Sequence, residues 1–379
     1  MRVALVTPRY PPNVKGGGEI SAQLLAEQLQ RYGDPVEELV VFSFDGREET
    51  TVNGVSVRRL RDISTPVTEL QNLLAFPALS GELASFDVVH AYNMELNPLV
   101  GYLSSVEEFV SVATLNSYHF FPKSVINVEP SLAERLYETL SYPTTGSVLR
   151  RLMRRIDAFV AISDALREVY HANGFERARI EHVPNMVDPS FEVPAVDDGH
   201  DWFRLLYVGA LEQHKGVEYL VRSMTHLPDD VQLRVVGDGR QATELRQLAT
   251  ELGVDTRIEF TGNVPYETIP ELYATADAFV HPGIWPEPFG RTILEALEAG
   301  LPVVCTDIGG PPETVPDEEL RCAPGDPASL AAAVRRAMEK SEASVTAENH
   351  DYIQRNYAPS VVVSQLVTLY AELVERRDG

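Results

Sequence analysis

The chain has 379 residues, which is more than one hydrophobic core usually fills and suits two domains. Apolar residues make up 44% of it and charged residues 23%, the composition of a globular protein and not of a disordered one. Its formal net charge of -24 weighs against general nucleic-acid binding, because phosphate requires a basic surface. The two cysteines form neither a disulfide framework nor a metal-ligand spacing, and they fit a reducing cytoplasm.

Lysine is scarce in this chain, since only four of the 32 basic residues are lysines. An acidic surface with so little lysine predicts a protein adapted to concentrated intracellular salt, which screens the repulsion between its charges. This hypothesis concerns habitat and not chemistry. A protein that is most stable in dilute buffer, and not in concentrated KCl, would contradict it.

The first half of the chain alternates short apolar runs with amphipathic stretches, which is typical of βαβ units and parallel sheets. The first run, Val3 to Thr7, is too short for the core of a signal peptide, and no stretch approaches the ~20 apolar residues of a membrane-spanning helix. We therefore expect no integral membrane protein. Strands are predicted over 2–7, 37–44, 55–60, 86–92, 108–115 and 158–163, and helices over 19–33 and 163–174.

The second half repeats this pattern after an acidic segment with Gly and Pro, 192–202, which is typical of a linker. Strands are predicted over 203–209, 231–237, 257–262, 277–282 and 301–306, and a last amphipathic helix over 359–377. Two doubly wound α/β domains follow, and ligands bind such sheets at the carboxyl ends of their strands.

Three glycine-containing loops follow predicted strands. Gly16, Gly17 and Gly18 precede a helix whose free N–H groups can face an anion, although a flexible turn explains them equally well. Lys215 stands at the start of another predicted helix, where a positive charge suits a diphosphate. Gly237, Gly239 and Ala242 match the dinucleotide fingerprint, with Glu259 at the right distance, but a tight strand-to-helix turn explains them at least as well.

The order of motifs resembles the GT-B glycosyltransferases of retaining family 4, also called glycosyl transferases group 1. The motifs run through nearly the whole chain, and the region from Gly262 to Glu313 is the most specific part; in order they are KGGGE, AISDAL, VPNMVD, YVGALEQHKGVEYL, VVGDG, FTGNVP and PEPFGRTILEALEAGLPVVCTDIGGPPE. The resemblance implies two Rossmann-like domains facing across a cleft. It assigns 1–190, completed by a returning helix at 358–379, to the acceptor and 200–357 to the nucleotide-sugar donor.

The same resemblance implies roles for particular residues. Glu287 and Glu295 form the E-x7-E motif, in which the first glutamate faces the transferred sugar and the second the ribose. Lys215, Gly17 and Gly18 are then expected at the diphosphate and the reacting sugar. The remaining donor-binding residues by this resemblance are Gly262 and Asn263 beside the base, and Phe289, Gly290 and Arg291 at the start of the helix after the first glutamate. No metal or cofactor is expected.

Two positions depart from the family pattern. Ala210 stands where relatives commonly have an arginine that pairs with the lysine on the diphosphate; Arg291 or His214 are candidates to replace it. Asn116 stands where many relatives have a histidine near the sugar, and His119, three residues on, is a candidate to reach the same space or an ordinary polar residue.

We therefore predict a cytoplasmic retaining glycosyltransferase that moves a sugar from a nucleotide diphosphate sugar to a hydroxyl of a surface glycan or lipid-linked saccharide. Arg150, Arg151, Arg154 and Arg155 suggest peripheral contact with the inner membrane face, or simply a solvated arginine face. The alternatives are a GT-B sugar-nucleotide epimerase and a catalytically weakened subunit that binds in a glycan-assembly complex. A nicotinamide-dependent dehydrogenase would rest on the Gly237 motif alone.

Overall fold

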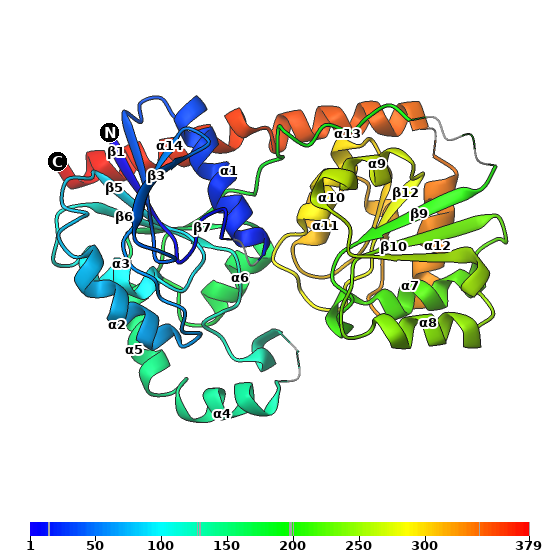
Figure 1. Cartoon of the computed structure of the whole chain (residues 1–379), viewed down its shortest axis with the longest axis horizontal. Coiled ribbons are helices and arrows are strands. Elements are labelled where there is room, and N and C mark those ends of the chain that lie inside the picture. The colour runs from blue at the N-terminus through cyan, green and yellow to red at the C-terminus, as the bar shows by residue number, and fades with distance from the viewer. Residues whose placement is uncertain are drawn as a thin grey trace. The chain divides into compact units, whose positions relative to one another are not determined.

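The computed structural model describes residues 1–13, 16–126, 128, 130–196, 199, 201–340 and 342–378. The chain forms two compact units, Met1–Met186 together with Pro359–Gly379, and Val187–Ala358. We call them the N-terminal and the C-terminal unit. Each one is a largely parallel sheet with helices packed on it (Figure 1). This is the α/β class that the alternating pattern predicts.

The N-terminal unit is built on an eight-stranded sheet in the order β3-β4-β2-β1-β5-β6-β7-β8. Its neighbours are parallel except for the antiparallel pair of β3 and β4. The strands are β1 (Arg2–Val6), β2 (Glu38–Ser43), β3 (Glu48–Val52), β4 (Val55–Arg59), β5 (Val88–Ala91), β6 (Val110–Leu115), β7 (Ala158–Ala161) and β8 (Ile180–His182). The central strands are buried on both faces, which explains why their sequences are mostly apolar and do not alternate with charged residues.

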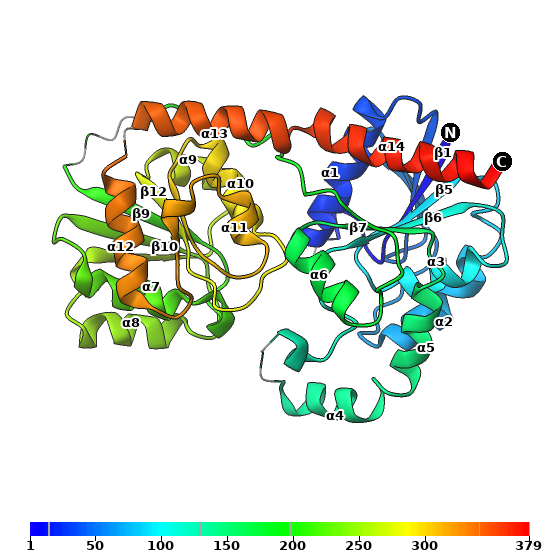
Figure 2. The same ribbon diagram turned by 180° about the vertical axis from the view of Figure 1, so that it is seen from behind.

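The helices of the N-terminal unit are α1 (Gly17–Tyr32), α2 (Thr68–Leu79), α3 (Asn97–Leu103), α4 (Leu132–Leu140), α5 (Thr145–Met153), α6 (Asp164–Ala172) and α14 (Pro359–Asp378), with a 3-10 turn at Lys123–Ile126. Helix α14 packs beside α1 on the sheet, as both views show (Figures 1 and 2). Its residues Val363 and Tyr370 are fully buried in the core of this unit. The last segment of the chain therefore completes the first unit.

The C-terminal unit has a six-stranded parallel sheet in the order β11-β10-β9-β12-β13-β14. Its strands are β9 (Phe203–Val208), β10 (Val231–Val236), β11 (Ile258–Gly262), β12 (Ala278–His281), β13 (Val303–Thr306) and β14 (Arg321–Cys322). The helices are α7 (Val217–Ser223), α8 (Ala242–Glu251), α9 (Ile269–Ala274), α10 (Arg291–Glu298), α11 (Pro311–Thr314), α12 (Pro327–Met338) and α13 (Glu342–Asn356), with 3-10 turns at Gln213–Lys215, Met224–His226, Asp255–Arg257, Tyr266–Thr268 and Glu318–Leu320.

Strand order fixes where each unit can bind a ligand. In the C-terminal unit the chain runs outward from β9 through β10 to β11 and then returns to the other side of β9 with β12. In the N-terminal unit it reverses in the same way between β1 and β5. A reversal separates the loops after the two central strands and opens a crevice at their carboxyl ends. The loops after β9 and β12, and those after β1 and β5, are thus the positions at which to look for a site.

One helical stretch of the described chain, Val345–Arg377, is long and apolar enough to cross a membrane by length and composition alone. No such stretch is predicted from the sequence. Half of the apolar 18-residue window within the stretch is buried inside the structure, however, and the α14 part of the stretch contributes to the core of the N-terminal unit. The apolar side chains of α14 are therefore explained by packing.

Each predicted strand matches an observed one, 55–60 matching β4, but the partner of β4 in its hairpin, β3, is not predicted, nor are the short strands β8 and β14. The turn of the hairpin is Asn53-Gly54, and both residues have positive φ, 49° and 86°. Asn-Gly is the sequence that a two-residue hairpin turn prefers, so the signal was present. The charged residues of β3, at the edge of the sheet, hid the strand because they lack a buried face.

Candidate functional site

The loops after β9 and β12 bring Lys215 and Glu287 together at the carboxyl end of the C-terminal sheet. Lys215 Nζ donates a hydrogen bond to Glu287 Oε2 over 2.8 Å. His281, the last residue of β12, places its Nε2 at 3.2 Å from the same oxygen. The lysine and glutamate side chains are 22% and 17% exposed. The first glutamate of the motif is thus held by two basic side chains and still reaches solvent.

Glycines allow the backbone to brace this glutamate. Gly310 N donates to the Glu287 carbonyl over 2.8 Å, and a Cβ on Gly309 or Gly310 would collide with the backbone of 286–289. Gly216, with φ 70°, packs in the same way against the Pro282 carbonyl. The two glycines of the TDIGGPPE stretch are therefore needed because one loop lies directly against the other. The prolines around Glu287 restrict the loop further.

The protonation state of Glu287 follows from its neighbours. Burial by itself raises the pKa of this carboxyl, but interaction with His281 and Lys215 outweighs the burial. The net result is a pKa well below the usual value of a glutamate. Glu287 is therefore a carboxylate at neutral pH, able to accept hydrogen bonds but not to supply a proton.

Glu295 lies in a different environment on α10. Its Oε1 accepts from the Tyr266 hydroxyl over 3.3 Å and its Oε2 from the Tyr273 hydroxyl over 3.1 Å. Burial raises the pKa of Glu295, and the charge of Arg291 and the two tyrosine hydroxyls offset this only in part. The two glutamates of the motif thus have pKa values moved in opposite directions. In both cases the hydrogen-bond partners fix the orientation of the carboxyl group.

The start of α10 carries three more predicted residues. Gly290 is the N-cap, with φ 97°, and Arg291 is the first residue of the helix. Phe289 is buried and meets the Tyr357 ring edge-on at 6.2 Å between centroids, so its side chain is part of the packing. Asn263 is exposed after β11, and Gly262, with φ 73°, accepts a hydrogen bond from Gly237 N on its carbonyl.

The dinucleotide-like glycines have a packing role. A Cβ on Gly237 would collide with the Gly209 carbonyl, and one on Gly239 with the Leu211 carbonyl. The GDG sequence is therefore required by the neighbouring loop 209–211, independently of any nucleotide. This agrees with a tight strand-to-helix turn and removes the only support for a dehydrogenase.

The N-terminal unit has its own polar cluster at its reversal point. Asn93, after β5 and with φ 65°, donates from Nδ2 to Thr7 Oγ1 over 3.2 Å. Asn93 Oδ1 accepts from Asn116 Nδ2 over 3.0 Å. A Cβ on Gly18, in the first turn of α1, would collide with this Oδ1. Gly17 begins the same helix, so the glycine loop and Asn116 meet at Asn93.

The structure places His119 apart from this cluster. Its Nε2 lies 2.8 Å from Thr68 Oγ1 at the start of α2, and its ring meets Phe120 edge-on. Asn116 and His119 therefore have different hydrogen-bond partners. Of the arginines, Arg150 stacks on the Tyr142 ring at 3.7 Å, and Arg155 donates to Ser105 Oγ over 2.8 Å.

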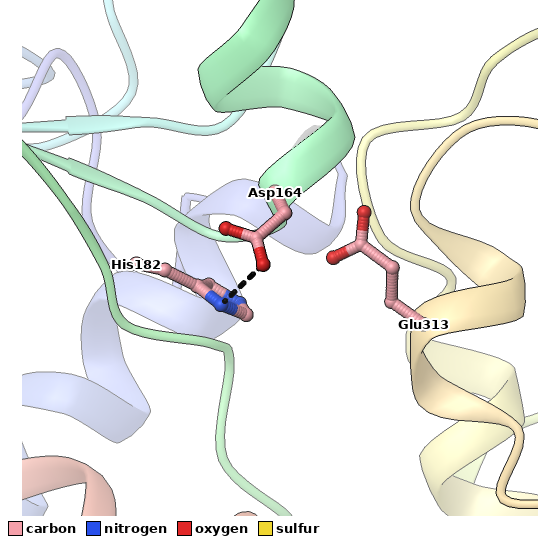
Figure 3. A group of neighbouring side chains, drawn as sticks. All are labelled: Asp164, His182 and Glu313. Carbon is pink, nitrogen blue, oxygen red and sulfur yellow. Dashed lines mark ion pairs between the residues drawn. The ribbon is translucent and has the colours of Figure 1, made fainter.

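A further pair of ionisable side chains in the N-terminal unit is shown in Figure 3. His182 Nδ1 lies 3.6 Å from Asp164 Oδ2. Arg167 Nη2, which is not drawn, is 2.7 Å from Asp164 Oδ1. Asp164 is the first residue of α6, where a negative charge suits the helix dipole. The pair therefore fastens α6 to β8, and we assign it to the stability of the unit.

Sequence reasoning missed four residues that hold the candidate site residues: Asn93, Tyr266, Tyr273 and His281. His281 lies at the carboxyl end of a predicted strand, and this position could have indicated that it is a site residue. The tyrosines lie in the stretch after FTGNVP, and nothing in their spacing points to Glu295. Asn93 belongs to no motif.

Comparison with known proteins gives the same family over both units. The model of glycosyl transferases group 1 matches residues 198–357, and that of glycosyltransferase family 4 matches residues 15–191. A GDP-mannose-dependent alpha-mannosyltransferase of Mycolicibacterium smegmatis is 28% identical, over 100% of this chain and 99% of its own. An uncharacterised glycosyltransferase of Methanocaldococcus jannaschii is also 28% identical, over 89% of each chain.

Solved structures share the fold. Sucrose-phosphate synthase from Thermosynechococcus elongatus matches with a TM-score of 0.76 and 21% identity over 99% of both chains. Anabaena HepE in complex with UDP and glucose matches with a TM-score of 0.72 and 21% identity, over 97% of this chain and 99% of its own. The solved structures show the GT-B fold, and the two family models, which match 15–191 and 198–357, show that the chain belongs to the GT-B glycosyltransferases of group 1.

Proposed function

We propose that this glycosyltransferase retains anomeric configuration and moves a sugar from a nucleotide diphosphate sugar to a hydroxyl of a saccharide or lipid-linked saccharide. The observation that carries the proposal is the Lys215–Glu287 pair at the reversal point of the C-terminal sheet, 2.8 Å apart and partly exposed. A cation that can bind the departing diphosphate thus lies next to a carboxylate that can bind the sugar hydroxyls. The proposal includes a cytoplasmic location and peripheral contact with the membrane.

Lys215 acts on the leaving group. As the glycosidic bond breaks, negative charge grows on the diphosphate, and a preorganised ammonium lowers the energy of that state. The N-terminal end of α10, next to Gly290, adds the partial positive charge of the helix dipole. Arg291 stands in the same turn and can assist where Ala210 supplies no arginine. These groups can neutralise the diphosphate by themselves, so we expect no metal.

Glu287 acts on the sugar. Both of its basic partners contact Oε2, which leaves Oε1 to accept from sugar hydroxyls. Because its pKa is low, the carboxylate stays charged and can also favour positive charge that develops on the sugar ring. In the proposed front-face reaction the bond from the anomeric carbon to phosphate breaks and the bond to the acceptor oxygen forms. The acceptor proton passes to the departing phosphate oxygen.

Glu295 and the loop after β11 act on the nucleoside. The Tyr266 and Tyr273 hydroxyls orient the Glu295 carboxyl, which then accepts from the ribose hydroxyls. Gly262 and Asn263 lie beside the base in this proposal, with the backbone of Gly262 fixed by Gly237. In the N-terminal unit, Gly17 and Gly18 approach the diphosphate and the reacting sugar, and Asn116 is the polar group offered to the sugar. His119 remains a second candidate there.

The first experiment is a set of thermal shifts in concentrated KCl with UDP, GDP, ADP, their common sugar conjugates and NAD. We expect one nucleoside diphosphate to stabilise the wild type and to lose that effect in Lys215→Ala. The ligand series also names the base. No response to any nucleotide, or a response to NAD alone, would refute the donor site. The same series against KCl concentration tests the predicted salt adaptation.

Product analysis separates transfer from its alternatives. Incubation with the stabilising sugar nucleotide and a saccharide acceptor should give a glycoside with the donor's anomeric configuration by NMR. An epimer of the donor sugar would indicate the epimerase alternative, and an inverted glycoside would refute retention. Binding of the nucleotide without turnover of any acceptor would favour a weakened binding subunit.

A further inference from the structure

Helix α4 carries a row of exposed leucines. Leu132, Leu136 and Leu140 are 87%, 63% and 59% exposed, and Tyr137 beside them is 37% exposed. Positions i, i+4 and i+8 of a helix lie on one face, so the three leucines form a continuous apolar strip. Apart from Ala133, whose side chain is not described, every side chain of α4 is exposed or half-buried. None of the described side chains of α4 therefore lies in the core.

The position of α4 leaves this strip open. In both views the helix lies at the outer end of the N-terminal unit, away from the sheet (Figures 1 and 2). Ser131 caps it through the Glu134 N–H over 3.3 Å, and Lys123 N donates to Glu138 Oε1 over 2.6 Å. The helix is thus well formed and anchored on its polar side. Its apolar side faces outward within this unit.

The surrounding segment is basic although the protein is strongly acidic. Residues 131–155, which contain α4 and α5, have five arginines and two glutamates, in a chain of net charge -24. Arg135 of α4 and Arg151 of α5 are both exposed. Arg150 and Arg155 are fastened to Tyr142 and Ser105, so the arginine cluster is in part structural. The exposed leucines of α4 are therefore a second feature of this surface, independent of the arginine cluster.

An amphipathic helix with exposed leucines on one face, in a segment with five arginines and two glutamates, fits the interface of an anionic bilayer. A second copy of the chain fits less well, because a two-fold contact would place the same arginine-rich segments opposite each other. We propose that α4 lies in the plane of an anionic membrane, with Leu132, Leu136 and Leu140 inserted among the acyl chains. This sharpens the membrane contact of the proposed function, but it is tested without any transfer reaction.

The test is cosedimentation of the whole chain with vesicles of phosphatidylcholine alone or with 30% phosphatidylglycerol. We expect the wild type to pellet with the anionic vesicles and to bind neutral ones at least tenfold more weakly. The double variant Leu136→Ser/Leu140→Ser should bind the anionic vesicles about a hundredfold more weakly, about tenfold for each lost leucine. Arg135→Glu/Arg151→Glu should reduce binding in low salt and have less effect in high salt, where charges are screened.

The matched control is Tyr32→Ser, which removes an exposed aromatic residue at the end of α1 in the same unit. It should bind vesicles like the wild type. Thermal melting and nucleotide-induced shifts should be unchanged in all variants, which separates failure of the membrane surface from failure of the donor site. Equal pelleting of wild type and leucine variant would overturn the proposal. So would a wild-type dimer that the leucine variant abolishes while neither protein binds vesicles.

Discussion

The two units place their candidate site residues at the same point of the same architecture, yet with opposite chemistry. In the C-terminal unit the reversal point holds an ammonium and a carboxylate in contact, Lys215 and Glu287, with His281 behind them. In the N-terminal unit the hydrogen-bonded cluster that the structure describes at the corresponding point is made of uncharged side chains, those of Thr7, Asn93 and Asn116. The fold decides where a ligand can bind, and the residues decide what is done there. We infer that charge is stabilised by one unit and that the other positions its ligand by hydrogen bonds and shape.

The largest loss of activity is expected when the charges of the C-terminal site are removed. Glu287→Gln and Lys215→Ala should each lower kcat by about a thousandfold, because a preorganised charge in such a site is worth several kcal/mol in the transition state. Lys215→Arg should recover part of the loss, since it keeps the charge but not the compact ammonium. Steady-state transfer assays measure this. Near-wild-type rates in both variants would remove Glu287 and Lys215 from the mechanism.

Two glycine substitutions, one crowded and one not, test whether the packing of the N-terminal site matters for activity. Gly18→Ala should lower kcat/KM by about tenfold to fiftyfold, because its Cβ displaces the whole Asn93 amide from both Thr7 and Asn116. Gly16→Ala is the control, since a Cβ there meets nothing within 4 Å. The neighbour that must move is a side-chain amide, so the fold should survive, and unchanged melting would show it. Equal activity of the two variants would contradict a role for this contact.

Removal of a single neutral hydrogen bond should have a smaller effect. Asn116→Ala deletes the donor to Asn93 Oδ1, and we expect about a fivefold loss of kcat/KM, the size of one uncharged hydrogen bond. His119→Ala, whose partner is Thr68, serves as the comparison. A loss of a hundredfold or more for Asn116→Ala would mean that the N-terminal unit also takes part in the bond-breaking step.

The two glutamates of the motif can be compared with each other by how their ionisation affects the stability of the protein. Because the pKa of Glu287 is lowered in the fold, its charge stabilises the protein above the pKa of an unfolded glutamate, and this is lost as pH falls toward the folded value. Glu287→Gln should therefore melt lower than wild type at pH 7, with the difference shrinking below about pH 4.

Glu295 should show the opposite sign. Its pKa is raised in the fold, so its protonated form is favoured and stability is lost as pH rises through the folded value. Glu295→Gln should melt higher than wild type at pH 7, by about 2 °C. Below the pKa of an unfolded glutamate the two proteins should melt alike. Calorimetry across pH measures both variants, and shifts of the same sign would contradict the assigned environments.

The α/β class and most central strands could be predicted from the sequence because buried parallel strands are unbroken apolar runs, as at Val3–Val6 and Val303–Thr306. The E-x7-E motif could be found because its loop repeats a known order of residues. The contacts of Glu295 with Tyr266 and Tyr273 could not, since they depend on how α9 and α10 pack. The same holds for Asn93, whose backbone φ of 65° no sequence pattern announced.

Helix α14 has a consequence for how the protein is made. When translation has reached Met186, the core of the first unit still lacks the buried side chains of Val363 and Tyr370. It also lacks the 2.5 Å hydrogen bond between the Tyr370 hydroxyl and His90 Nδ1. The ribosome must add the whole second unit before that gap can close. The unit that is synthesised first therefore cannot complete its core until the twenty residues of α14 have been made.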